Sequence, residues 1–182
     1  SFEDNKKEFG FYLGTKIYEE RHPVDNSFFM SQDGYMIGLI SASADYSQDS
    51  YFGWITRLAA GEVNYTSNGT GTMTGIPDYQ FETTGYLGIP FEGSNYRITP
   101  FGGLGFRYLL NASGLKQSST GHSGYDRESR YLYAPFGINI ESSPVNNSYW
   151  EFRAEYLHFI SGQQTSYLSQ VSSNYNDFTN DQ

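Results

Sequence analysis

The amino-acid sequence predicts an all-β protein: an up-and-down antiparallel transmembrane β-barrel that forms a single domain over residues 1–182. Three observations lead to this prediction. Apolar residues recur at every second position and almost nowhere with a helical period. The strand segments are longer than those of an ordinary β-sandwich. Short and long connections alternate along the chain, as they do in outer-membrane barrels.

Seven segments have the alternation of a strand, and each is about 12 to 16 residues long, whereas strands of globular proteins usually have about five or six. A tilted strand that crosses a membrane needs about 9–11 residues and some overhang. No run approaches the length of apolar sequence that a membrane-spanning helix requires. The predicted strands are Glu8–Glu20, Gly34–Tyr46, Ser50–Glu62, Asp78–Phe91, Asn95–Leu110, Ser129–Ser142 and Ser148–Ile160.

The connections between these strands are long and short by turns, which predicts that all tight turns lie at one end of the sheet. Outer-membrane barrels have this asymmetry, with short periplasmic turns and long external loops. The N-terminal residues are then expected on the periplasmic side. The connections are Arg21–Asp33, Ser47–Asp49, Val63–Pro77, Glu92–Ser94, Asn111–Glu128 and Ser143–Asn147, followed by a tail from Ser161.

Each predicted strand has an apolar and a polar face, and alternation alone does not say which face points inward. A soluble lipocalin-like barrel has its apolar face inside, whereas a membrane barrel turns that face to lipid. A charged content of only 17% favours the lipid-facing arrangement, as do aromatic residues near the strand ends. The polar-face charges nearly balance, as a paired interior requires. The predicted interior charges are Lys16, Asp45, Arg57, Glu82, Arg97, Arg107, Glu141, Glu151, Arg153 and Glu155.

Three segments carry a resemblance to a known group: Ile98–Arg107, Gly124–Tyr133 and Trp150–Tyr156. They resemble the small outer-membrane β-barrels of Gram-negative bacteria, the opacity-protein, OmpA-transmembrane and OmpW-like group. The resemblance implies eight strands, a mature form without a signal peptide in the bacterial outer membrane, and contact with the lipid bilayer and lipopolysaccharide.

That group usually ends in an aromatic-terminated closing strand, whereas this sequence has seven clear strands and ends at Asp181-Gln182. We therefore expect one of two arrangements. Either the natural protein continues past Gln182 into a closing strand, or Thr165–Val171 pairs as a short irregular one.

Composition and motifs limit the chemistry. Twenty acidic against 11 basic residues, a net charge of −9, argue against nucleic-acid binding, and the absence of cysteine excludes thiol chemistry. No cofactor and no metal are expected.

His158 and Ser161 superficially resemble the lipid-facing histidine and serine of lipid A deacylases, but a spacing of three puts them on opposite faces of a regular strand. No catalytic role is therefore predicted for them.

The loops are where binding is expected. Phe28, Phe29 and Met30 form an apolar triplet in the polar loop Arg21–Asp33, where they either extend the barrel wall, fold over its mouth, or contact an extracellular or host ligand. We expect a non-enzymatic outer-membrane barrel with a plugged, charge-paired interior, whose long loops serve envelope structure or surface interaction. The alternatives are a narrow porin-like channel, a lipid A-modifying enzyme, and a soluble barrel that binds an apolar ligand.

Overall fold

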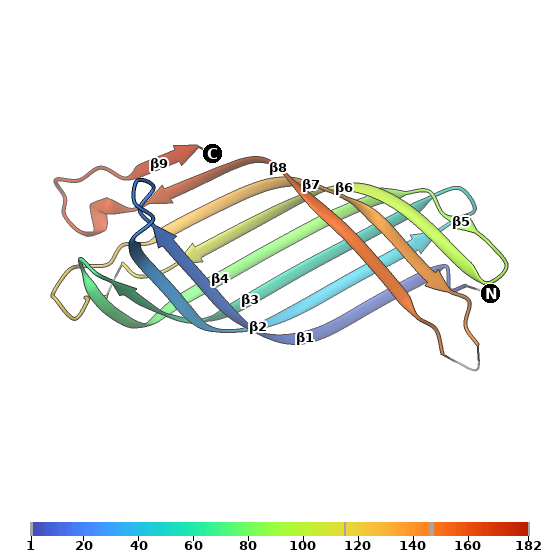
Figure 1. The fold of residues 1–182 in the computed structure, drawn as a ribbon, viewed down its shortest axis with the longest axis horizontal. Coiled ribbons are helices and arrows are strands. Elements are labelled where there is room, and N and C mark those ends of the chain that lie inside the picture. The colour runs from blue at the N-terminus through green and yellow to red at the C-terminus, as the bar shows by residue number, and fades with distance from the viewer. Residues whose placement is uncertain (1, 115, 146–147, 182) are drawn as a thin grey trace.

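The computed structural model describes residues 2–114, 116–145 and 148–181, which form one antiparallel sheet of nine strands and one 3₁₀ turn (Figure 1). The all-β, up-and-down antiparallel prediction is confirmed. No helix among these residues is long and apolar enough to cross a membrane. The elements are β1 (Asn5–Arg21), β2 (Phe28–Tyr46), β3 (Tyr51–Ser67), β4 (Gly71–Gly88), β5 (Phe91–Glu92), β6 (Tyr96–Asn111), β7 (Arg127–Ser142), β8 (Glu151–Ser166), η1 (Leu168–Gln170) and β9 (Phe178–Asp181).

The seven long strands lie where the sequence predicts them, but each has 16 to 19 residues. Part of the extra length lies at the two ends of the sequence, because β1 begins at Asn5 and β8 continues through the predicted tail to Ser166. The rest comes mainly from two segments predicted as loops. Most of Val63–Pro77 continues β3 and β4 to a turn at residues 68–70, and the end of Arg21–Asp33 belongs to β2. Val63, Met73 and Ile76 pack together in this extension, so an apolar cluster supports it as strand. Among the described residues, the stretch 112–114 and 116–126 is the one long irregular connection between long strands.

The sheet is open within the described residues. Strands follow the order β1-β2-β3-β4-β6-β7-β8-β9, with β5 beside β6, and β1 pairs with neither β8 nor β9. The predicted closure into a barrel is therefore not formed. Thr165–Val171 is not the irregular closing strand, because it ends β8 and enters η1. The short strand is instead β9, which pairs antiparallel with Gln163–Ser166 of β8.

The connections divide between two ends of the sheet (Figure 1). We call one the short-turn end: it holds residues 47–50, 89–95, 143–145 and 148–150. The N-terminal segment lies at the same end, where the Tyr46 N–H donates to the Asp4 carbonyl at 2.7 Å. The other is the loop end, with residues 22–27, 68–70, 112–126 and 167–177.

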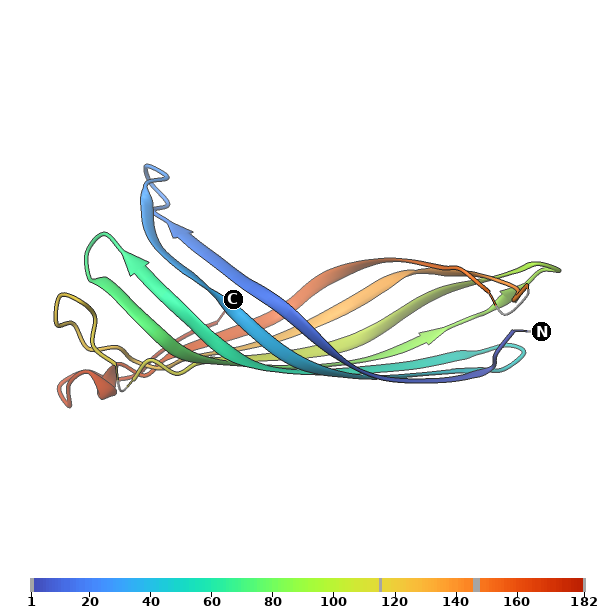
Figure 2. The ribbon, with the colours of Figure 1, turned by 90° about the horizontal axis from the view of Figure 1, so that it is seen from below.

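The sheet is strongly curved (Figure 2), so that side chains of non-adjacent strands meet on its inner side. Lys16 on β1 donates to Asp78 on β4 at 2.6 Å, although β2 and β3 lie between them. In a flat sheet these strands would be roughly 14 Å apart. Such contacts are possible only across a trough, which defines a concave and a convex face.

The two faces differ in chemistry and in burial. On the concave face the Arg97, Asp78 and Glu141 side chains are almost entirely buried. On the convex face large apolar side chains are exposed, and Leu13 of β1 exposes 84% of its surface. The predicted placement of polar residues on the inner side and apolar residues on the outer side is therefore found in this sheet. The exposed convex residues include Phe9, Phe11, Ile17, Ile37, Phe52, Trp54, Leu58, Leu87, Leu104, Phe136 and Phe152.

Glycine permits aromatic rings to lie flat against the concave wall. An added Cβ at Gly38 would be 2.2 Å from the Tyr12 ring, and one at Gly105 would be 2.2 Å from the Tyr133 ring. Because no side chain fits in that space, these glycines let tyrosine rings fill the trough between the charged groups.

Candidate functional site

Nine of the ten predicted interior charges lie on the concave face, in register with its buried residues; the list is Lys16, Arg57, Glu82, Arg97, Arg107, Glu141, Glu151, Arg153 and Glu155. Asp45 is the exception. It is exposed, pairs in register with Asn5 and Phe52, and accepts from Asn5 Nδ2 at 2.6 Å. The strand alternation gives the inward position to Tyr46, so the interior placement of Asp45 is wrong.

The short-turn cluster surrounds Arg97, whose side chain is completely buried. Arg97 pairs with Glu141 of the neighbouring strand and lies over the Tyr46 ring, 3.6 Å from its centroid. It also bonds the N-terminal segment, through Asp4 Oδ1 at 3.2 Å and the Glu3 carbonyl at 2.9 Å. The N-terminal segment thereby closes the concave face at this end.

Lys6 completes the short-turn cluster by joining opposite edges of the sheet. Its ammonium group on β1 pairs with Glu141 on β7, and with Glu151 on β8 at 3.7 Å. The sequence prediction missed Lys6 because it precedes the predicted first strand. Only the curl of the sheet brings it to these carboxylates.

The central triad consists of Arg57, Glu82 and Arg107 on the adjacent strands β3, β4 and β6. The Glu82 carboxylate accepts from Arg57 Nη1 at 2.7 Å and from Arg107 Nε at 2.6 Å. The Arg107 guanidinium also lies 5.7 Å from the Tyr133 ring centroid, and the Tyr133 hydroxyl is 2.7 Å from Thr84 Oγ1. One carboxylate therefore pairs with two cations in the middle of the trough.

Two further ion pairs line the concave face. Arg153 Nη2 donates to Glu155 at 2.6 Å, and its guanidinium packs 4.0 Å from the Phe101 ring centroid. Nearer the loop end, Asp78 accepts from Lys16 and from Asn111 Nδ2 at 3.1 Å. The sequence prediction missed Asp78, which stands at the boundary of a predicted loop. Its Oδ1 is buried and has no partner among the described residues.

The apolar triplet lies at the start of β2, so its assignment to a loop is wrong. Met30 is fully buried on the concave side, while Phe29 packs edge-on against His22 with centroids 5.2 Å apart. The triplet therefore extends the sheet wall, one of the arrangements that the sequence left open.

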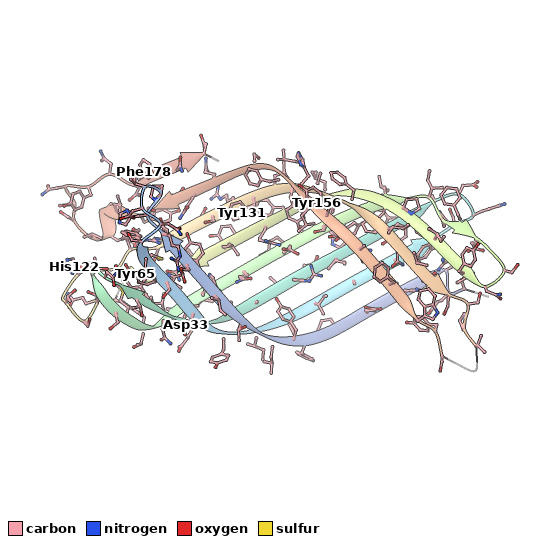
Figure 3. All side chains as sticks on the ribbon, viewed as in Figure 1. Asp33, Tyr65, His122, Tyr131, Tyr156 and Phe178 are labelled. Atoms are coloured by element: carbon pink, nitrogen blue, oxygen red, sulfur yellow. The ribbon has the colours of Figure 1, made fainter. Side chains whose placement is uncertain are left out.

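At the loop end a pocket of about 180 Å³ opens between the β3–β4 hairpin and the 112–126 connection. Hydrogen bonds tie the connection to the hairpin. The Ser119 N–H donates to the Thr72 carbonyl at 2.8 Å, the Thr72 N–H donates to Ser119 Oγ at 3.0 Å, and Thr120 Oγ1 donates to the Thr70 carbonyl at 2.8 Å. Tyr65 of β3 and His122 of the connection both line it, and Figure 3 labels them at the loop end of the sheet. Sequence reasoning missed this pocket, because it depends on a loop folding back over distant strands.

His158 and Ser161 lie on the same, convex face, in contrast to the prediction. Ile160 forms a bulge opposite β7, so that His158 pairs with Ala134 and Ser161 with Leu132. The extra residue reverses the alternation. Within the described ranges no hydrogen bond joins His158 to Ser161, and the imidazole instead faces Phe136 at 6.3 Å between centroids. The arrangement lacks the oriented base that a nucleophilic serine needs.

Outside the strands, two carboxylates hold turns at the loop end. The Ser169 hydroxyl and N–H lower the pKa of the Asp177 carboxyl, and the N–H and hydroxyl of Ser27 lower the pKa of Asp25. Each carboxylate therefore stabilises its turn in the ionised form. Among the described residues no group of three or more His, Asp or Glu side chains is arranged to hold a metal ion.

Comparison with known protein families, with the sequences of curated proteins and with solved structures finds no match to this chain.

Proposed function

We propose that this chain forms the wall of a non-enzymatic β-barrel in the outer membrane of a Gram-negative bacterium, with its convex face against lipid. The observation that carries the proposal is the exposure of large apolar side chains over the convex face while charged side chains are buried on the concave face. In water this distribution is unfavourable, because burial of apolar surface is the main force that stabilises soluble folds. In a bilayer it is the favourable one.

The convex face is also apolar along the middle of the strands and polar at the loop end, as a lipid-facing surface is. A shallow groove of about 560 Å³ crosses it, lined mainly by apolar side chains such as Phe11, Leu39 and Leu58. At the loop end the same face turns polar: the Tyr108 and Tyr167 hydroxyls donate to Glu128 at 3.1 Å, and Glu128 pairs with Arg130. A polar belt beyond an apolar band suits the headgroups of a bilayer and of lipopolysaccharide.

The proposal requires that the free edges of β8 and β1 be satisfied, since open edges in lipid leave backbone groups without partners. The Lys6–Glu151 ion pair holds these two edges within reach of each other at the short-turn end. A lysine and a glutamate can together span two strand spacings, roughly 9.5 Å. One further strand therefore fits between them, and β9 already has its direction along β8. Such a strand would complete eight.

The paired charges support a plugged interior rather than a conducting pore. An eight-stranded barrel is only wide enough for side chains to fill its interior. Six cations of the concave face each have a carboxylate partner: Lys6, Lys16, Arg57, Arg97, Arg107 and Arg153. The barrel then acts as a rigid frame that presents the loop-end connections for envelope structure or for binding an extracellular partner.

Leu13→Arg tests the lipid-facing surface, because its cost depends on what surrounds this exposed side chain. In water, arginine at a position 84% exposed changes stability by less than about 0.5 kcal/mol. At the midplane of a bilayer it costs about 2–4 kcal/mol. We expect the larger loss, measured by denaturant unfolding of protein refolded into phospholipid vesicles.

Val24→Arg is the matched control, since Val24 is equally apolar, 95% exposed, and lies in the turn at residues 22–27 outside the apolar band. Its unfolding free energy should equal that of the wild type. Equal stability of the Leu13 and Val24 variants in vesicles, or recovery of the wild type as a monomer in detergent-free buffer, would contradict the proposal.

A further inference from the structure

The loop-end pocket has the size and wall chemistry of a site for a small ring-containing molecule. A cavity of about 150 Å³ holds benzene, and this one measures about 180 Å³. Phe29, Tyr65, Met73 and Ile76 supply apolar surface, and Tyr65 is held by a 2.8 Å hydrogen bond to Thr70. The pocket thus has room for one six-membered ring and a polar substituent.

The polar side of the pocket has the chemistry of an anion-binding site. Arg127 lines it and is the only concave-face cation of the described residues without a carboxylate within 4.0 Å. Its Nη2 donates to the Tyr125 hydroxyl at 2.8 Å and its guanidinium lies over that ring, which fixes its direction. Side-chain amides of Gln32 and Asn111 lie on the same wall.

The residues around Arg127 strengthen its attraction for an anion. No Asp or Glu lines the pocket, although the chain has 20 acidic residues. The two acidic residues that flank Arg127 in the sequence are already engaged. The Asp126 carboxylate accepts from the Gly114 N–H at 2.8 Å and from Gln170 Nε2 at 2.9 Å. The Glu128 carboxylate accepts from the Tyr108 hydroxyl and pairs with Arg130 on the convex face. N–H groups of the Arg127 guanidinium therefore remain free to donate to a ligand. They lie in a partly buried site, where charge-assisted hydrogen bonds are strong.

We propose that the loop-end pocket binds a small organic carboxylate with a ring-sized apolar body, and that Arg127 recognises the carboxylate. The ring lies between the apolar wall and the 112–126 connection, and the carboxylate accepts hydrogen bonds from the guanidinium. This goes beyond the proposed membrane function and does not depend on it, because the pocket is lined only by strand ends and connections near the loop end, which the apolar convex band does not form.

Benzoate is the probe, titrated into the whole chain in detergent micelles and followed by saturation-transfer NMR. We expect saturable binding with a Kd of about 1 mM or lower, which is typical of a ligand of this size. Benzyl alcohol has the ring without the charge and should bind at least about ten-fold more weakly, because it loses the charge-assisted bonds.

Two variants and one matched control locate the site. Arg127→Gln keeps a donor toward Tyr125 but removes the charge and should weaken benzoate about ten-fold or more. Ser123→Phe fills the mouth of the pocket from an exposed position without changing charge and should abolish binding. Arg130→Gln removes a cation of the same strand on the convex face, outside the pocket, and should leave the Kd unchanged.

The proposal is overturned by any of three results: no saturable binding of benzoate, equal affinities for benzoate and benzyl alcohol, or wild-type affinity in Arg127→Gln or Ser123→Phe. A β-sheet circular dichroism spectrum equal to that of the wild type establishes that each variant is folded. If only one of the two pocket variants folds, that variant decides the question.

Discussion

The short-turn cluster and the central triad lie on the same face and consist of the same kinds of residue, yet they stabilise different features of the sheet. In the central triad, Arg57, Glu82 and Arg107 lie on adjacent strands and their arginines are about 40% exposed. In the short-turn cluster, Arg97 is completely buried and Lys6 reaches from β1 to β7 and β8.

The difference shows that burial and strand topology, rather than residue type, decide how much an ion pair contributes to the stability of the fold. A pair between neighbouring strands adds little to a register that backbone hydrogen bonds already hold, and exposed pairs contribute about 0–1 kcal/mol. A pair that crosses the trough holds the curl itself. If such a pair is buried, loss of one partner leaves an uncompensated charge, which costs about 3–5 kcal/mol.

The largest effect is expected from Arg97→Met, which leaves Glu141 buried with Lys6 alone and frees the N-terminal segment. Although Glu141 keeps Lys6, the variant loses the Arg97 hydrogen bonds to Asp4 and to the Glu3 carbonyl and the packing of its guanidinium on the Tyr46 ring. Because hydrogen bonds of a buried charged group are each worth about 1.5–3 kcal/mol, we expect the unfolding free energy in vesicles to fall by about 3–5 kcal/mol. Arg107→Met is the matched control on the same strand and face, and should cost about 1 kcal/mol or less because Glu82 keeps Arg57. Equal losses in the two variants would remove the distinction between the cluster and the triad.

Lys16→Met tests whether a trough-crossing pair outside the short-turn cluster behaves in the same way. Asp78 is fully buried and would retain only the Asn111 amide, so we expect a loss of about 2–3 kcal/mol. Adding Asp78→Asn removes the stranded charge and should recover part of that loss. If the double variant is less stable than Lys16→Met in the same denaturant titration, the destabilisation has another cause.

The smallest effect is expected from Arg57→Met, about 1 kcal/mol or less, since Glu82 then keeps Arg107. The double variant Arg57→Met/Arg107→Met leaves the Glu82 carboxylate without a cation and should lose more than the sum of the single variants, by about 0.5–3 kcal/mol. A double-mutant cycle measures this coupling. Strict additivity would mean that the triad does not act as a unit.

Much of the fold could be predicted because alternation is a local property. The apolar and polar positions of Trp150–Glu155 can be read from the chain itself, and the seven strands follow from the same period. The placement of Asp45 was wrong against the local alternation itself, whereas two other errors arose where the fold departs from the local pattern. The bulge at Ile160 moves Ser161 to the face of His158, and the Val63–Met73–Ile76 cluster turns a predicted loop into a hairpin.

The candidate site divides in the same way. The sequence by itself determined which residues carry charge, and the strand period assigned nine of ten to one face. Only the tertiary structure decided their partners, because Lys6–Glu141 and Lys16–Asp78 join residues 135 and 62 positions apart. The curl of the sheet brings those residues together. The pocket beside Arg127 has the same origin: it exists because the 112–126 connection folds over the β3–β4 hairpin, and no strand period encodes that contact.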